Sequence, residues 1–287
     1  MADIFRNTPE RIPVDRMIDQ VDRCFAVNDM EGAGRVLENW RREALRMNDK
    51  AGELSVVSEM LGYYRKILDE ANALEAIDRA EVLLRELHMD HGHAAVSAAT
   101  IRLNMGTTSK AFGLTDQALR LYSEAGTVLT AQLSPDDMLL AGFYNNYAIA
   151  LAEKAAELMK EGDAERICTE GPSDNGDPSE PDMFYKKAEE LFEKALVIDK
   201  ANSNYADGAI TYTNMADMYF RMFGDEDPHY DGFMQKAMEL LEDPAAVRDS
   251  YYAFVTSKCA DTFDFFGYFG YAAELRERSD KIYKEQR

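Results

Sequence analysis

Asparagine side chains recur along the chain at one position of a repeated pattern. Each lies two residues before a glycine or alanine, and a larger side chain stands between the two. The set comprises Asn104, Asn146 and Asn214, and Lys258 takes the same offset once. Residues three or four apart share one face of a helix, so nearby polar side chains join them in a polar strip. These neighbours are Thr107, Asn145, Asp217, Arg221 and Asp261. Amides both donate and accept hydrogen bonds, which suits recognition of a peptide backbone.

The strip has a plainer interpretation, in which the asparagines only tie neighbouring helices to each other. If the strip instead binds a peptide, its charges indicate which peptide it favours. The bases at hand are Lys110, Arg221 and Lys258, and the acids that offset them are Glu153, Asp217, Asp261 and Asp264. A mixed, mostly acidic surface favours a neutral or basic ligand over an acidic tail, by charge complementarity.

Three of the four histidines, His88, His91 and His93, fall within the segment HMDHGH (88–93). With Asp90 they offer imidazole and carboxylate ligands for Zn²⁺ or another transition metal. The same segment also suits a turn between helices, punctuated by Asp90 and Gly92. No HExxH, CxxC, glycine-rich phosphate loop or GxSxG motif occurs in the sequence. We therefore expect no enzyme, no metal and no other cofactor.

The charge of the chain limits its partners. Its 287 residues include 32 basic and 53 acidic side chains, a formal net charge of −21. Such a chain repels nucleic acid and anionic membrane surfaces, so neither is an expected partner. The scattered Cys24, Cys168 and Cys259 favour reduced thiols over a disulfide framework. No apolar run has transmembrane length and the opening residues lack a signal-peptide stretch, so we expect a cytoplasmic protein.

Helical periodicity dominates the chain and predicts an all-α protein. Residues 50–69 carry an apolar stripe at the spacing of one helix face, formed by Leu54, Val57, Leu61, Tyr64 and Leu68. Alternating strand patterns with hairpin turns are hard to find. The same plan of two helices joined by a short turn fits most of the chain.

One small residue marks each predicted first helix, and these residues recur at a regular interval. They are Gly62, Gly106, Ala148, Ala216 and Ala260, with intervals of 44, 42, 68 and 44 residues. We interpret them as points where the two helices of a hairpin approach closely and a larger side chain would not fit. With a weaker first copy over residues 14–48, they predict about six antiparallel helical hairpins in a single solenoid domain over residues 1–287.

The long interval contains residues 161–182, which are rich in proline, glycine, serine and acids. We predict an acidic loop inserted in the fourth hairpin there. Its simplest state is a solvated loop, and the alternative is a lid over the binding surface.

Residues 99–132 resemble a tetratricopeptide repeat (TPR). The family's spacing is met by Met105-Gly106, Gly113, Ala118, Tyr122 and Ala125. The interval of 42 to 44 residues is similar to the longer repeats of kinesin light chains and bacterial TPR proteins. The resemblance implies a right-handed superhelical solenoid whose first helices line a concave, peptide-binding groove. It also implies that residues 269–287 form a C-terminal capping helix.

These observations predict a non-enzymatic scaffold or adaptor that binds a protein or peptide, although the fold does not fix the ligand. The alternative is a ligand-responsive regulatory module similar to the repeat domains of bacterial peptide-pheromone receptors. A metal-dependent enzyme that uses His88, His91 and His93 is the weakest hypothesis. The aromatic-rich segment 251–271 exceeds what one helix face can bury. Phe265 and Tyr268 are therefore candidates for an open end of the groove or a homodimer surface.

Overall fold

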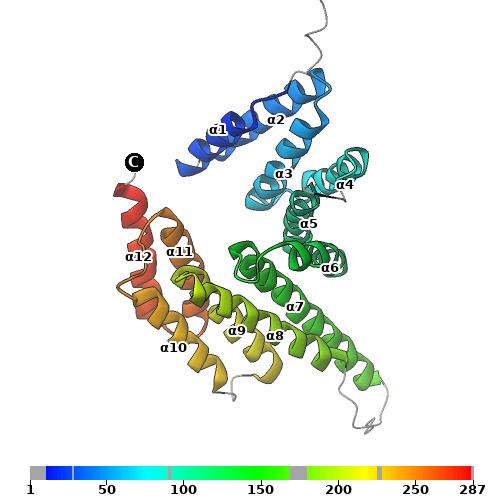
Figure 1. Cartoon of the computed structure of the whole chain (residues 1–287). Coiled ribbons are helices and arrows are strands. Elements are labelled where there is room, and N and C mark those ends of the chain that lie inside the picture. The colour runs from blue at the N-terminus through cyan, green and yellow to red at the C-terminus, as the bar shows by residue number, and fades with distance from the viewer. Residues whose placement is uncertain are drawn as a thin grey trace, which may run out of the picture. The chain divides into compact units, whose positions relative to one another are not determined.

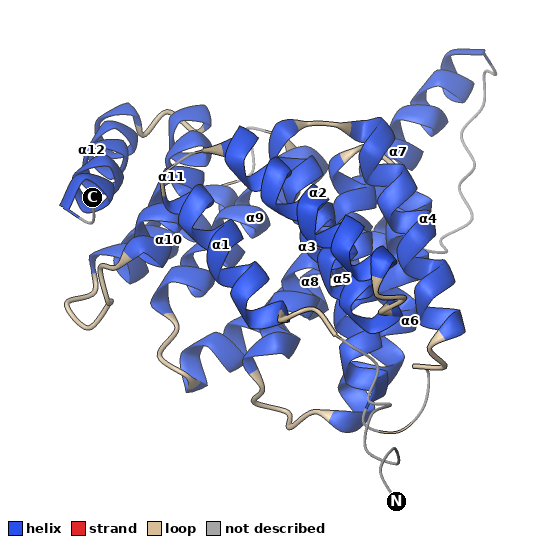
Figure 2. Cartoon of the chain, turned by 90° about the horizontal axis from the view of Figure 1, so that it is seen from above, coloured by secondary structure: helices blue, strands red, loops and turns tan. Residues whose placement is uncertain are grey.

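Within the part of the chain that the computed structural model describes, helices are the only regular secondary structure (Figures 1 and 2). That part is residues 11–285 without residue 28, residues 90, 91 and 93, residues 169–179 and residues 225–227, and the side chains of residues 161–168 lie outside it too. Its helices are α1 (Val14–Ala26), α2 (Met30–Arg46), α3 (Lys50–Ile67), α4 (Glu70–Glu86), α5 (Ala94–Ala111), α6 (Thr115–Gln132), α7 (Met138–Cys168), α8 (Glu180–Ala201), α9 (Tyr205–Phe223), α10 (His229–Glu242), α11 (Ser250–Phe265) and α12 (Phe269–Glu285). Consecutive helices pack as six hairpins, from α1 with α2 to α11 with α12. The predicted all-α class and the number of hairpins are confirmed.

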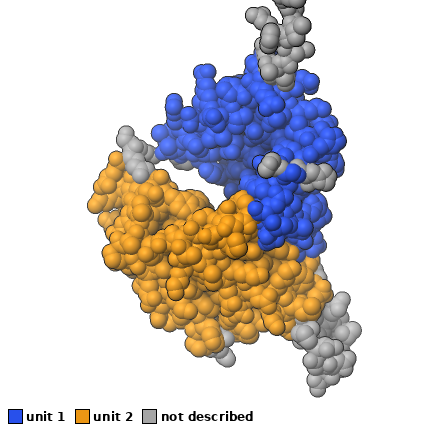
Figure 3. Space-filling view, in the orientation of Figure 1, with its two compact units in different colours: residues 1–132 blue, residues 133–287 orange. Residues whose placement is uncertain are grey.

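The chain divides into two compact units, Met1–Gln132 and Leu133–Arg287, coloured separately in Figure 3. Unit 1 contains α1 to α6, and unit 2 contains α7 to α12. Each unit therefore holds three hairpins. The single solenoid over residues 1–287, with its superhelical hand, stays a prediction.

Aspartates begin four of the helices, because their side chains accept a hydrogen bond from the backbone N–H three residues further on. These caps are Asp29, Asp49, Asp69 and Asp249. The end of α3 corrects the apolar stripe predicted over residues 50–69. The helix stops at Ile67, and Leu68 adopts a left-handed conformation with φ of 57°. Its side chain is consequently 77 % exposed instead of packed in the core.

The apolar faces of these helices meet in a core within each unit. In unit 1, Leu37 of α2 and Leu61 of α3 are fully buried. In unit 2, Met234 of α10 and Phe263 of α11 are fully buried. Burying one such side chain contributes about 1.5–3 kcal/mol, so a helix with an uncovered apolar face gains stability by packing on its neighbour.

The small residues predicted at close approaches are needed at some positions and not at others. A Cβ atom built on Gly106 would lie 2.9 Å from Cε1 of Tyr122, which is fully buried on α6. The packing at Gly106 therefore explains why this helix interior tolerates a glycine. At Gly62 the prediction is wrong, because a Cβ atom there would meet no neighbour within 4 Å.

The acidic segment 161–182 is shorter as a loop than the sequence predicts. Helix α7 continues to Cys168 and α8 begins at Glu180, so both ends of the segment are helical. Residues 169–179 lie outside the described part of the chain, and the predicted loop and lid cannot be placed there. None of the described helices combines the length and apolar character needed to cross a bilayer.

The aromatic segment 251–271 splits between core and surface. Tyr252 and Phe263 are buried, whereas Phe265 of α11 and Phe269 of α12 are 63 % and 68 % exposed. Tyr268 is half-buried, and its hydroxyl donates a hydrogen bond to Asp231 of α10. Of the two predicted residues only Phe265 is exposed, and the open groove end and the homodimer surface both stay predictions. The C-terminal segment forms α12, and its capping role is likewise a prediction.

Candidate functional site

The polar strip of unit 2 centres on a pair of asparagines from two first helices. Asn145 lies on α7 and Asn214 on α9, and Asn214 Nδ2 donates a hydrogen bond to Asn145 Oδ1 at 3.0 Å. The bond joins consecutive hairpins, as the plainer interpretation expects. Asn145 Nδ2 and Asn214 Oδ1 have no hydrogen-bond partner within the described residues. The amide nitrogen of Asn145 therefore remains available as a donor, and the amide oxygen of Asn214 as an acceptor, at fixed positions.

An ion pair lies beside these amides on α9. Arg221 Nε is 2.7 Å from Asp217 Oδ2, and the two side chains are 48 % and 42 % exposed. Burial acts to lower the pKa of Arg221, but the hydrogen bond and charge of Asp217, with the charge of Glu153, raise it overall. Glu153, Asn214, Asp217 and Arg221 border a hollow of ≈ 20 Å³. The strip thus presents amide, acid and base side by side.

Asn146 follows Asn145 on α7 but is used differently. Its Nδ2 donates to the backbone oxygen of Gly142 at 2.9 Å, within its own helix. On the helical wheel it shares a face with Ile149 and Glu153, which both border the hollow. Asn146 is therefore next to the strip without being fixed by the neighbouring hairpin.

The two remaining predicted residues of unit 2 lie on α11 and contact other side chains. Lys258 Nζ is 5.9 Å from the ring centre of Phe254, in a cation–π arrangement. Asp261 pairs with Arg276 of α12 at 3.1 Å. Both predicted residues are exposed. The structure shows no contact between them and the amides of α7 and α9.

In unit 1 the predicted residues are Asn104 and Thr107 of α5. The Asn104 side chain is exposed, and its Nδ2 donates to Ser58 Oγ of α3 at 3.4 Å. The Tyr122 hydroxyl donates to Thr107 Oγ1 at 3.1 Å. Asn104 again links first helices of consecutive hairpins. Since these two residues belong to unit 1 and the other seven to unit 2, the predicted strip is described as two surfaces.

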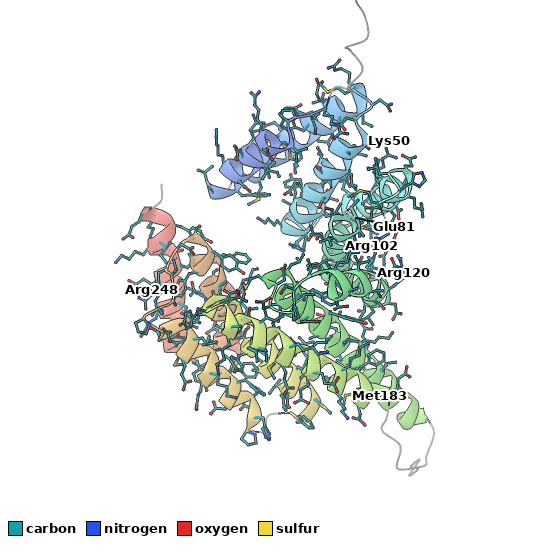
Figure 4. All side chains as sticks on the ribbon, in the orientation of Figure 1. Lys50, Glu81, Arg102, Arg120, Met183 and Arg248 are labelled. Carbon is teal, nitrogen blue, oxygen red and sulfur yellow. The ribbon has the colours of Figure 1, made fainter. Side chains whose placement is uncertain are left out.

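One cation of unit 1 was not among the predicted site residues. Arg65 of α3 is half-buried, and burial lowers its pKa. No described carboxylate forms an ion pair with Arg65. By contrast, Arg120 lies 2.9 Å from Glu81 of α4 (Figure 4). The sequence held a signal, because Arg65 follows Ser58 by seven residues and so shares its helix face. Arg65 therefore adds a cation to the unit 1 strip.

The histidine cluster falls largely outside the described residues. His91 and His93 cannot be placed, and His88 lies just after α4 with φ of 51°. Among the residues that the structure describes, no group of three His, Cys, Asp or Glu side chains is arranged to hold a metal ion.

No family model and no curated protein matches the chain. The chain does match solved structures. BtubC (BKLC) from P. vanneervenii has 15 % identity and a TM-score of 0.49, over 96 % of this chain and 92 % of that one. A putative kinesin light chain of Podosopora anserina with nearly identical TPR-like repeats has 14 % identity and a TM-score of 0.44, over 82 % and 96 %. The chain is similar to TPR-like repeat proteins.

Proposed function

We propose that this chain is a non-enzymatic scaffold or adaptor that binds a protein or peptide on the polar strips of its first helices. The observation that carries the proposal is the Asn145–Asn214 hydrogen bond of unit 2. It holds Asn145 Nδ2 and Asn214 Oδ1 in place and leaves both open. A peptide group offers one N–H and one C=O, so an extended peptide can satisfy both amides at once.

The charges favour a neutral or basic ligand. Glu153 and Asp217 surround the single base Arg221 at the unit 2 hollow, and the chain as a whole carries a net charge of −21. A basic side chain of a bound peptide would complement this field, whereas an acidic tail would be repelled. The same charge supports an adaptor that binds neither nucleic acid nor membranes, and we propose that it acts in the cytoplasm.

Site-specific photo-crosslinking tests the proposal on the full chain. A benzophenone amino acid replaces Asn146, beside the strip, or Glu190, an exposed residue of α8. After irradiation in host lysate, we expect a crosslinked partner from position 146 and none from position 190.

A double variant assigns that crosslink to the strip. Asn214→Ala with Asp217→Ala should lower the yield from position 146 by about tenfold, because hydrogen bonds and an ion pair to a basic side chain of the ligand are lost. The control Glu190→Ala with Glu193→Ala changes two exposed residues of α8 and should leave the yield unchanged. A crosslink that survives the first pair, with the helical signal intact, contradicts the proposal.

The alternative, a ligand-responsive regulatory module, is favoured by one observation. Unit 2 contains a separate cavity of ≈ 500 Å³ between α8, α9 and α10. In such a module, a ligand in this cavity would change the affinity for the partner, and the partner would change the affinity for the ligand equally. Crosslinking from position 146 at rising concentrations of a cavity ligand distinguishes this module from a passive scaffold.

A further inference from the structure

The cavity of unit 2 lies where α8 ends and α9 begins, with α10 closing one side. Its volume of ≈ 500 Å³ is in the range that holds small ligands. The apolar part of its lining comes from Leu196, Val197, Tyr205, Gly208, Tyr212 and Leu240. Most of the wall is therefore suited to an apolar body.

This cavity and the polar strip are different surfaces of α9. Tyr205 and Tyr212 are seven residues apart and share one helix face, whereas Asn214 and Arg221 lie on the opposite face. A ligand in the cavity therefore does not compete for the asparagines.

Asp199 of α8 lines the cavity and is an unsatisfied acid. Its side chain is only 3 % exposed. Asn204 Nδ2 donates to Asp199 Oδ1 at 3.3 Å, but Oδ2 has no hydrogen-bond partner. A carboxylate there lacks a donor, and a carboxylic acid would lack an acceptor for its O–H. Buried polar atoms are rarely left in this state unless something else binds them.

The neighbours of Asp199 add negative charge. The Asn204 amide is shared with Asp207 of α9, which also accepts a hydrogen bond from the hydroxyl of Tyr251 of α11. No described cation pairs with either aspartate. Burial, with the charge of Asp207, raises the pKa of Asp199 to about 7. An incoming cation would relieve both the missing hydrogen bond and the repulsion between the two acids.

We propose that this cavity binds a ligand with one primary ammonium group on an apolar body, and that Asp199 accepts the hydrogen bond from the ammonium. The ammonium supplies the donor that Oδ2 lacks, and the apolar walls bury the rest of the ligand. Lys200 also lines the cavity, so a second cationic group at that end is repelled and monoamines are preferred to diamines. Two sources fit this chemistry, a free small amine and the lysine side chain of a bound peptide.

Calorimetry on the full chain near pH 8 tests the ligand chemistry with four probes. Phenethylamine carries the ammonium, phenethyl alcohol is its neutral counterpart and 3-phenylpropionate its anionic one. N-acetyl-lysine methylamide represents the lysine side chain. We expect phenethylamine or the lysine analogue to bind at least about tenfold more tightly than the alcohol and the acid, as charge-assisted hydrogen bonds exceed neutral ones. If phenethylamine binds more tightly, the source is a free small amine. If the lysine analogue binds more tightly, the source is the lysine side chain of a peptide.

Two variants assign the binding to the cavity. Asp199→Asn keeps the shape but removes the charge, and should weaken amine binding by about tenfold or more. Asp280→Asn makes the same change at an exposed residue of α12 and should leave binding unchanged. Val197→Trp places an indole at a rim residue that is 70 % exposed and should block binding without disturbing the core. The proposal is overturned if neither amine binds, if the alcohol binds as tightly, or if Asp199→Asn binds like the parent chain.

Discussion

The buried acids of the two units differ in their hydrogen-bond partners. Asp49 and Glu53 in unit 1 are 6 % and 3 % exposed, and Asp199 in unit 2 is 3 % exposed. Asp49 accepts from the N–H groups of Ile12 and Gly52, both at 2.9 Å. Glu53 accepts from Arg79 with both oxygens, at 2.7 and 2.6 Å. Asp199 has a single bond of 3.3 Å and a second oxygen with none.

The difference shows what a buried carboxylate is used for. A buried charge costs free energy unless donors surround it, and in unit 1 those donors come from the chain itself. Asp49 ties Ile12 to the start of α3, and Glu53 ties α3 to α4, so both acids stabilise the fold. In unit 2 the chain leaves one oxygen of Asp199 without a donor beside an empty volume. That arrangement lowers the stability of the fold, and it leaves a hydrogen-bond acceptor for a ligand.

The largest effect should follow from breaking the best-satisfied pair. Arg79→Ala leaves the Glu53 carboxylate buried without its two donors, and should lower the free energy of unfolding by about 3–5 kcal/mol. Urea unfolding followed by circular dichroism measures the loss. The control Arg35→Ala removes an i,i+4 pair with Glu31 whose side chains are 61 % and 87 % exposed. It should change stability by less than about 0.5 kcal/mol. Equal losses in the two variants would mean that the Glu53 pair is no different from a surface pair.

The next effect has the opposite sign and depends on pH. The pKa of Asp199 is raised from its ordinary value of 3.8 to about 7, so the folded state binds this proton more tightly than the unfolded state. Stability is therefore lost as pH rises from about 4 to about 7 and is not regained above it. Asp199→Asn removes the loss. Each pH unit between the two pKa values changes the free energy of unfolding by about 1.4 kcal/mol. Relative to the parent chain, Asp199→Asn should therefore be more stable at pH 8 than at pH 4 by at most about 4 kcal/mol.

Urea unfolding of Asp199→Asn and the parent chain at several pH values measures this gain. Asp280→Asn serves as the control, because it makes the same change at an exposed residue of α12. If the parent chain and Asp199→Asn respond to pH in parallel, Asp199 is not the unsatisfied acid that the comparison requires.

The smallest effect should come from Asp49→Ala, which removes a helix cap and the bond to Ile12. Losing a cap and leaving a buried N–H without a partner should cost about 2 kcal/mol together. Asp69→Ala removes an equivalent cap on α4, whose second bond comes from the exposed Asn72 side chain and not from a buried N–H, and should cost about 1 kcal/mol. Differential scanning calorimetry of both variants measures the difference. Equal losses would show that the bond to Ile12 adds nothing.

Sequence periodicity was sufficient to predict the hairpins, because each depends on a repeated local pattern. The same pattern located Gly106, whose missing side chain accommodates Tyr122. It failed at Gly62 and at Leu68, because both depend on local details. The helix neighbouring Gly62 happens to leave space, and α3 ends one residue before Leu68.

The sites were harder to predict than the fold. Spacing placed Asn104 and Asn214 on first helices, but whether an amide binds a ligand or a neighbouring helix depends on its hydrogen bonds in three dimensions. Asp199 did leave a signal. Ala188, Phe192 and Ala195 mark the buried face of α8, and the next position on that face holds an acid. Only the structure shows that this acid lacks a partner and borders a cavity.

Carbon-13 NMR of the Asp199 carboxyl group, assigned with Asp199→Asn, is the most direct test of this contrast between the units. The account predicts that the carboxyl titrates with a pKa of about 7 in the free chain. Addition of phenethylamine should lower this pKa, because a bound ammonium favours the ionised form. A pKa near 4 in the free chain, with no response to the amine, would show that Asp199 is already satisfied and would contradict the account.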